Sequence, residues 1–269
     1  ALGLTFKRIQ FTPDLMPTDI TGTDMVEEDQ STGKREWRFV PGPVFTNVLL
    51  ADEINRTPPK TQAALLEAMQ EKTVTVRGQL HTLDKPFLVL ATQNPIELEG
   101  TYPLPEAQLD RFLFNEILDY LSPEEEVAVL DRFTRRVDMP EVEACTTSEE
   151  ITKFQWLVRQ VPISESVTRY AVDVVRATRP SDPLATDMIK KYINFGSSIR
   201  ASMNLVLASK ARALMDGRYH VTPDDIKSLA PPILRHRVLP NYYAESDGVT
   251  VDDILNSMLN EIPAPTAAS

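Results

Sequence analysis

Two short, uninterrupted runs of apolar residues constrain the fold of this chain more than any other feature. They occupy residues 48–51 (Val-Leu-Leu-Ala) and 87–91 (Phe-Leu-Val-Leu-Ala). A strand that is apolar on both sides needs cover on both faces of its sheet, which is typical of parallel strands connected by helices. Residues 5–11 fit a further strand ahead of these two. The sequence therefore predicts an α/β fold built on a parallel sheet.

A helix is expected between the two apolar runs. Thr57 is a suitable N-cap, two prolines follow in the first turn, and Leu65, Ala68 and Met69 recur at helical spacing to give one apolar face. After this helix, residues 73–83 place a glycine between two strand-forming stretches, which indicates a β-hairpin.

The chain divides into an α/β part and a helical part. We expect the α/β domain to cover residues 1–138, with a third short strand over 112–117 and a polar insertion over 13–43 that forms a loop or a twisted hairpin. Beyond a change in composition, residues 147–262 carry helical patterns and few strand signals. The Pro- and Ala-rich residues 263–269 fit a disordered tail.

Composition narrows the functional class. The 269 residues carry a formal net charge of -11, which argues against broad binding to nucleic acid or to an anionic membrane, because both depend on clustered cations. No apolar run approaches the ~18 residues of a membrane span. Cys145 is the single cysteine, which excludes a disulfide within the chain and suits a reducing compartment. We expect a cytoplasmic protein.

The strongest chemical signal is the acidic pair Asp52 and Glu53, which directly follows the first apolar run. Ligands of open α/β sheets bind at the carboxyl ends of the strands. Adjacent residues of a strand point to opposite sides, so the two carboxylates would have separate roles. Asp52 would hold a magnesium ion through its water shell, and Glu53 would be the base that polarises an attacking water. The alternative is a strand that happens to end in two solvated acids.

Asn94 follows the second apolar run and would lie at the same edge of the sheet as Glu53. An amide there can orient a water and contact a terminal phosphate. Taken alone, an asparagine directly before Pro95 is better explained as a turn residue.

Two arginines complete the set of candidates. Arg111 ends a short helix that begins at Pro105, where it either complements the helix dipole or acts as an arginine finger in the site of a neighbouring subunit. Arg200 lies in or near the first turn of a later helix, where the dipole disfavours a cation unless a bound phosphate offsets it. The alternative for Arg200 is a surface arginine paired with an acid.

The order of these elements resembles that of the AAA+ ATPases, in which a Walker B strand, sensor 1, an arginine finger and a helical lid with sensor 2 follow one another. The sequence motifs themselves are most similar to those of the MoxR family, and the similarity extends to about residue 260. The stretches that carry the resemblance are residues 11–22, 51–56, 91–95, 99–112 and 234–237. The resemblance implies an AAA+ parallel-sheet core followed by an all-α lid, and hydrolysis of ATP with Mg²⁺. It assigns the base to Glu53, the metal to Asp52, sensor 1 to Asn94, the finger to Arg111 and sensor 2 to Arg200.

The resemblance also implies an assembly. Residues 13–43 look like the helix-2 insert and residues 73–83 like the pre-sensor hairpin, and in relatives such hairpins face a central pore. Related proteins form hexameric rings with nucleotide bound between subunits. MoxR proteins are treated as chaperone-like and are associated with partners that carry a von Willebrand factor A domain and with the maturation of client enzymes.

Two features depart from the family pattern. Sensor 2 usually reads Gly-x-Ser-Pro-Arg, and here Ile199 replaces the proline while the arginine is kept. In addition, the Walker A pattern GxxxxGK[ST] cannot be built from the glycines present, since the Gly33-Lys34 pair is followed by Arg35. That loop supplies backbone amides, a lysine and a hydroxyl to the phosphates and the metal. We therefore expect an N-terminally truncated form of the core that by itself binds ATP poorly.

Three alternatives compete with an ATPase of the MoxR type. An interaction scaffold without nucleotide would explain the missing loop, although the retained site residues argue against it. A magnesium-chelatase-like subunit would share the same site residues. A nucleic-acid motor would share the hairpin insertions, but the net charge of -11 argues against it.

Overall fold

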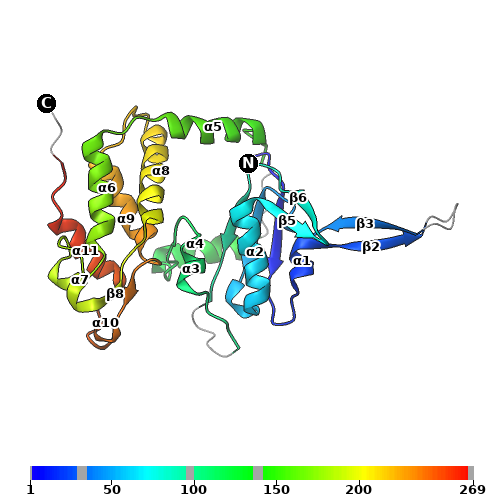
Figure 1. Cartoon of the computed structure of the whole chain (residues 1–269), viewed down its shortest axis with the longest axis horizontal. Helices are drawn as coiled ribbons and strands as arrows, with labels where there is room; N and C mark the ends of the chain where they lie inside the picture. The colour runs from blue at the N-terminus through cyan, green and yellow to red at the C-terminus, as the bar shows by residue number, and fades with distance from the viewer. Residues whose placement is uncertain (1, 29–34, 95–99, 136–141, 266–269) are drawn as a thin grey trace. The chain divides into compact units, whose positions relative to one another are not determined.

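The computed structural model describes residues 2–28, 35–94, 100–135 and 142–265, and the chain forms two compact units (Figure 1). The first, here called the sheet unit, holds Leu2–Arg111 together with Thr146–Leu157. The second, the helical unit, holds Phe112–Cys145 and the chain from residue 158 onward. Each unit is described by itself.

A three-stranded parallel sheet forms the centre of the sheet unit. It has the order β1-β4-β7, with β1 at Phe6–Gln10, β4 at Val48–Asp52 and β7 at Leu88–Ala91. The two apolar runs are therefore neighbouring parallel strands, which confirms the predicted α/β class. Because the strands are parallel, their carboxyl ends meet at one edge of the sheet.

The two faces of this sheet differ in burial. On one face Ile9, Leu49 and Ala51 are buried, as are Leu65 and Leu66 of helix α2 (Pro59–Glu71). On the other face, Phe6, Leu88 and Leu90 of the two outer strands are 59%, 51% and 50% exposed, whereas Val48 and Leu50 of the central strand are partly buried. Among the described residues, the expected cover is therefore complete on one face and partial on the other.

Helix α2 begins one residue later than predicted. Its N-cap is Pro58, in an extended conformation, and Pro59 is its first residue. The predicted cap Thr57 is fully buried, and its hydroxyl has no hydrogen-bond partner within the described residues. The reason is the pair of prolines: the restricted φ of proline suits the cap and the first helical position, so the start moves to them.

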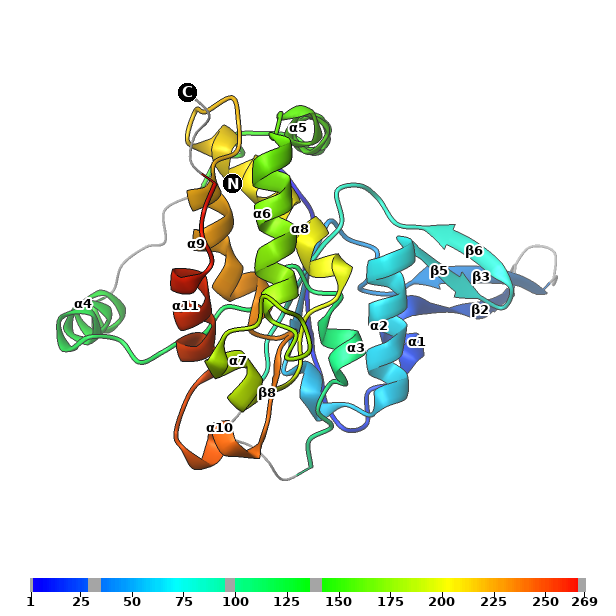
Figure 2. The same cartoon turned by 60° about the vertical axis from the view of Figure 1, so that its left-hand side comes forward.

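Two antiparallel hairpins accompany the sheet (Figure 2). The first follows helix α1 (Pro17–Thr21) and pairs β2 (Gly22–Glu28) with β3 (Arg35–Pro41). The second pairs β5 (Thr73–Val76) with β6 (Gln79–Thr82), and both residues of its turn have positive φ, Arg77 at 48° and Gly78 at 81°. The insertion over 13–43 is therefore a short helix followed by a hairpin.

Helices make up nearly all of the helical unit. They are α4 (Pro123–Thr134), α6 (Glu165–Ala177), α7 (Asp187–Tyr192), α8 (Ile199–Met215), α9 (Pro223–Leu234), α10 (Tyr242–Ser246) and α11 (Val251–Glu261), with a short antiparallel pair of β8 (Ile193–Phe195) and β9 (Leu239–Pro240). Helix α5 (Ser148–Gln160) spans the division between the units. The apolar face of α6 is buried in the core as its spacing indicates, with Tyr170 at 3% exposure and Val174 at 0%.

The predicted third strand over 112–117 is wrong, because these residues, all of them described, form no strand. Their backbone bonds to the end of α9 instead. The N–H of Asn115 donates to Pro232 O at 2.8 Å, and Leu113 O accepts from Arg237 Nη1 at 3.3 Å. Consequently the compact units divide between residues 111 and 112, and the first domain does not extend to residue 138 as expected.

The end of the chain has no regular secondary structure over residues 263–265, and residues 266–269 of the predicted tail lie outside the described residues. Within the part of the chain that is described, no helix is long and apolar enough to cross a membrane.

Candidate functional site

The acidic pair lies where β4 ends. Asp52 is the last residue of the strand, and Glu53 adopts a left-handed conformation with φ 55° and ψ 49°. Residues other than glycine rarely adopt this conformation, which costs on the order of 1 kcal/mol and often marks a functional position. Thr92, directly after β7, holds the turn: its hydroxyl accepts from the N–H of Glu53 at 2.8 Å and its carbonyl from the N–H of Ile54 at 3.0 Å.

The carboxylate of Asp52 bridges the two outer strands. Thr92 Oγ1 donates to Asp52 Oδ1 at 2.6 Å, and Arg8 Nε of β1 donates to Oδ2 at 3.1 Å. These hydrogen bonds, that of Thr92 first and that of Arg8 second, lower the pKa of Asp52 below its ordinary value. Asp52 is therefore ionised at neutral pH, the state that a hard cation requires.

The carboxylate of Glu53 has different partners. Its Oε2 accepts from Gln10 Nε2 at 2.7 Å and from Arg56 Nη1 at 3.1 Å, and the side chain keeps 23% of its surface exposed. Asp52 and Glu53 thus lie side by side in sequence but use separate partners, so one can bind a cation while the other faces water.

A buried polar cluster joins this turn to the loop that carries Asn94. Asn55 Nδ2 donates to the backbone oxygen of Asn94 at 3.3 Å. The fully buried amide of Gln62 donates to the carbonyls of Ile54, Thr57 and Tyr102 at 3.2, 3.0 and 2.9 Å. Asn94 is thereby held at the same edge of the sheet as the acidic pair.

The two arginines lie elsewhere. Arg111 follows α3 (Glu106–Leu109), and its Nη1 donates to Leu66 O of α2 at 3.3 Å. Arg200 belongs to the helical unit, as the second residue of α8, where the hydroxyl of the N-cap Ser198 accepts from its N–H at 3.3 Å. Arg200 therefore lies in the first turn of its helix, as the sequence indicates. Arg111, in contrast, lies one residue beyond Asp110, the C-cap of α3, and not within the helix that the sequence predicts to end near it.

Three residues of the site are not among the candidates predicted from the sequence: Arg8, Gln10 and Thr92. The first two follow the period of two in β1 and lie on the face opposite Ile9, and Thr92 is the first residue beyond β7. The alternation in β1 is visible in the sequence, but its alignment with β4 is not, because that alignment depends on strand order.

The residues present suit part of a nucleotide site. An ionised carboxylate beside a hydroxyl, as in Asp52 with Thr92, offers the oxygen donors that Mg²⁺ prefers together with its own waters. Within the described residues no group of three or more His, Cys, Asp or Glu side chains forms a metal cage.

Comparison with protein families identifies the class of this chain. Residues 1–114 match the model of the ATPase family associated with various cellular activities (AAA), and residues 185–258 match the AAA lid domain. These two matches, to a core and a lid that correspond to the sheet unit and to part of the helical unit, identify the chain as an AAA+ ATPase.

Individual relatives show to which family of AAA+ ATPases the chain belongs. The chain is 42% identical over 264 residues to Chaperone MoxR1 of Mycobacterium tuberculosis, covering 98% of this chain and 68% of that protein. It is 42% identical to the uncharacterized protein YeaC of Bacillus subtilis, covering 100% of this chain and 80% of YeaC. A solved structure of an ATPase candidate from Cytophaga hutchinsonii matches with a TM-score of 0.89 and 43% identity, over 98% of this chain and 79% of that one. The chain belongs to the MoxR family of AAA+ ATPases.

Proposed function

We propose that this chain is the hydrolytic part of a MoxR-type ATPase, which couples the hydrolysis of ATP to chaperone-like remodelling or maturation of a client protein. The observation that carries the proposal is the acidic pair at the carboxyl end of β4, with Thr92 and Asn94 beside it. The name of the relative Chaperone MoxR1 supports the chaperone-like role.

In the proposed reaction, Glu53 accepts a proton from the attacking water as a phosphoanhydride bond of ATP breaks. Its carboxylate is held by hydrogen bonds from Gln10 and Arg56, and its backbone is left-handed. Asp52 would hold Mg²⁺ through water, and the bound ion would neutralise charge on the phosphates. Asn94 is proposed to orient the water and to contact the terminal phosphate.

Charge that develops on the phosphate in the transition state needs cations close by. We assign these to Arg111, acting on the site of a neighbouring subunit, and to Arg200 of the lid. This assignment requires a ring, which we propose to be a hexamer of identical subunits. A protein with a von Willebrand factor A domain is proposed as a partner in recognising the client.

The sequence holds no GxxxxGK[ST] loop, so a polypeptide of residues 1–269 by itself is expected to bind ATP weakly. A dissociation constant in the low micromolar range would contradict this. Turnover assays therefore use a form of the protein that carries such a loop.

The proposal is tested by replacing each of the two carboxylates in turn, in the form of the protein that carries such a loop. Asp52→Asn is expected to raise the Mg²⁺ concentration needed for half-maximal turnover. Glu53→Gln is expected to lower kcat with little change in the Mg²⁺ requirement. The proposal is wrong if neither variant loses turnover, because hydrolysis would then depend on residues other than the acidic pair.

A further inference from the structure

A groove of about 340 Å³ lies in the sheet unit where α1, α2, the start of β2 and β5 come together. Its lining includes Glu67 and two alanines of α2, threonines of α1 and β2, and five consecutive residues, 73–77, of β5 and its turn. Ligand pockets commonly begin at this size, which accommodates a few residues of an extended peptide.

The groove follows the edge of β5 and not one of its faces. A strand shows alternate residues to each face, so a cavity over a face would be lined by every second residue. Here the lining residues are consecutive. The groove therefore lies beside the backbone of β5, on the side away from β6.

The hairpin register shows which backbone groups point into it. The two-residue turn at Arg77 and Gly78 makes Val76 and Gln79 the closing hydrogen-bonded pair, and such pairs alternate along the hairpin. The bond from the N–H of Leu83 to Lys72 O, at 2.9 Å, continues that alternation. Thr75 falls between bonded pairs, so its N–H and C=O point away from β6 and toward the groove.

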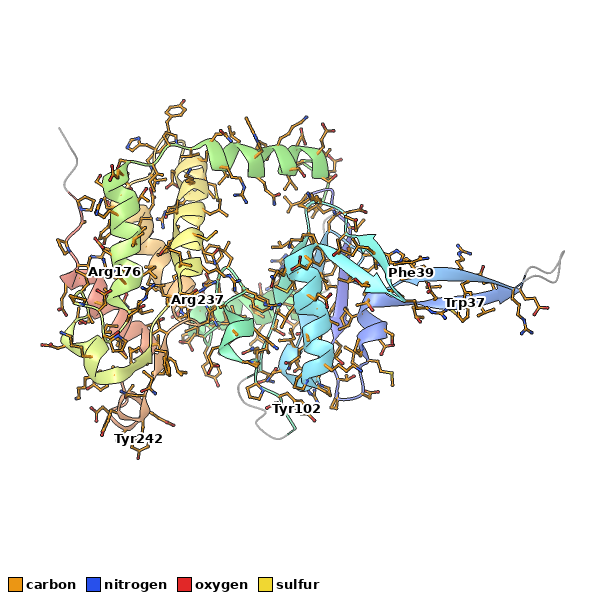
Figure 3. The ribbon with its side chains drawn as sticks, viewed as in Figure 1. Trp37, Phe39, Tyr102, Arg176, Arg237 and Tyr242 are labelled. Atoms are coloured by element: carbon orange, nitrogen blue, oxygen red, sulfur yellow. The ribbon has the colours of Figure 1, made fainter. Side chains whose placement is uncertain are left out.

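Two aromatic side chains of β3, Trp37 and Phe39, contact the β5–β6 hairpin; both are labelled in Figure 3. The guanidinium of Arg77 lies 3.9 Å from the centre of the Trp37 ring, and His81 stacks on Phe39 with ring centres 3.9 Å apart. Both contacts join the β5–β6 hairpin to β3. An edge that is fixed before binding loses less conformational entropy when a strand is added to it.

The groove carries an available negative charge. The carboxylate of Glu67 is exposed and has no hydrogen bond or ion pair within the residues that the structure describes. Ala64 and Ala68, its neighbours on α2, leave room around it. The guanidinium of Arg77 is already engaged with Trp37, so the groove favours a ligand with a cation opposite Glu67.

We propose that this groove binds an extended segment of the client, which adds as a strand to the edge of β5 and places a Lys or Arg side chain against Glu67. Strand addition uses the backbone groups of Thr75 for affinity and Glu67 for selectivity. The identity of the partner rests on the proposed client-remodelling function, whereas the binding itself requires no nucleotide.

The experiment measures fluorescence polarisation of a labelled peptide, Thr-Val-Thr-Lys-Thr-Val-Thr, with the 269-residue protein and no nucleotide. Thr75→Pro removes the outward N–H without removing a hairpin bond, and Leu80→Pro makes the same change at the opposite edge. We expect Thr75→Pro to weaken binding at least about tenfold, since two backbone hydrogen bonds are lost or distorted. Leu80→Pro is expected to stay within about twofold of the unmodified protein. Thermal unfolding of both variants checks that the fold is kept.

The charge is tested separately with Glu67→Gln and with the peptide whose central Lys is replaced by Glu. The unmodified protein is expected to prefer the Lys peptide about fivefold, and Glu67→Gln to abolish that preference. Absence of binding, or equal effects of Thr75→Pro and Leu80→Pro, overturns the proposal. Failure here leaves the hydrolytic role of Glu53 intact, and loss of that role leaves this binding site intact, because one assay measures peptide binding without nucleotide and the other measures ATP turnover without peptide.

Discussion

The guanidinium of Arg8 on β1 donates to the carboxylate of Asp52 on the neighbouring strand β4, from Nε at 3.1 Å and also from Nη2. Arg8 is 58% exposed and Asp52 21% exposed, so the pair lies at the surface of the site. The positively charged guanidinium of Arg8 therefore contacts the same carboxylate that we propose as the metal ligand.

Removal of Arg8 is expected to favour metal binding. Arg8→Gln takes away a competing cation, so the dissociation constant of Mn²⁺, used as a spectroscopic substitute for Mg²⁺, is expected to fall about fivefold, the scale of an exposed ion pair. Lys7→Gln removes the same charge from the opposite face of β1 and serves as the control. Weaker binding in Arg8→Gln would show that Arg8 positions Asp52 for the metal.

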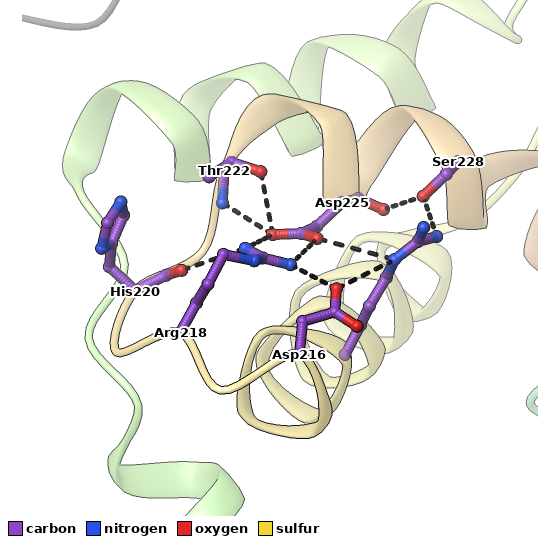
Figure 4. A network of polar contacts seen from close by, with 7 residues as sticks. Asp216, Arg218, His220, Thr222, Asp225 and Ser228 are labelled. Atoms are coloured by element: carbon purple, nitrogen blue, oxygen red, sulfur yellow. Dashed lines mark hydrogen bonds and ion pairs between the residues drawn. The ribbon is translucent and has the colours of Figure 1, made fainter.

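The helical unit is expected to lose stability in acid through Asp225, which is 2% exposed (Figure 4). Burial raises the pKa of Asp225, but hydrogen bonds from Arg218 at 2.6 and 2.7 Å, and from Thr222, outweigh it and lower the pKa. Because the folded pKa lies below the unfolded value of about 3.9, this stabilisation is present above that pH and is lost as the pH falls through the folded pKa.

Asp225→Asn should therefore destabilise the helical unit by roughly 2–4 kcal/mol at pH 7, since it leaves Arg218 without its buried partner. The difference from the unmodified protein should shrink toward pH 3. Urea denaturation at several pH values measures both effects. Asp216→Asn, at a side chain that is 51% exposed, is the control and should change stability little. A difference that is independent of pH would contradict the account.

Gln62 is expected to be the most sensitive polar position of the sheet unit. Gln62→Leu leaves three carbonyls without their side-chain donor, of which those of Ile54 and Thr57 belong to the turn that follows Glu53. The expected loss of stability is about 2–4 kcal/mol, measured by urea denaturation. Gln70→Leu, on an exposed position of the same helix, should stay within about 0.5 kcal/mol. Equal effects would mean that the amide of Gln62 contributes nothing beyond packing.

The role of Arg111 in trans is tested by mixing subunits in a form that hydrolyses ATP. Arg111→Ala alone is expected to remove turnover while leaving nucleotide binding, because the finger acts on a neighbour. When Arg111→Ala and Glu53→Gln subunits are mixed, some interfaces combine an intact Glu53 with an intact Arg111, so part of the activity should return. No recovery on mixing would indicate that both residues act within one subunit.

The sequence predicts the parallel strands and the position of the acidic pair because those features depend on local patterns. The apolar runs at 48–51 and 87–91 are long enough to specify buried strands, and the carboxyl ends of parallel strands must meet. The hairpin around Gly78 is equally local, since its turn needs positive φ at two adjacent residues.

The incorrect strand prediction, and the contacts that the sequence does not reveal, involve partners distant in sequence. Residues 112–117 have the composition of a strand. Their backbone groups, however, form hydrogen bonds with Pro232 and Arg237, which lie more than a hundred residues away. The contact of Arg8 with Asp52 depends on the order of the strands, and the left-handed conformation of Glu53 depends on Thr92. No local pattern contains these relationships.

The hydrolytic role of Glu53 is the central claim, and the most direct test is ATP turnover together with nucleotide affinity in Glu53→Gln, in a form that carries a phosphate-binding loop. Turnover is expected to fall at least about 100-fold, the usual contribution of a general base, while nucleotide affinity stays unchanged within a few-fold. Turnover close to that of the unmodified protein would contradict the account, since the acidic pair would then be only the solvated end of a strand.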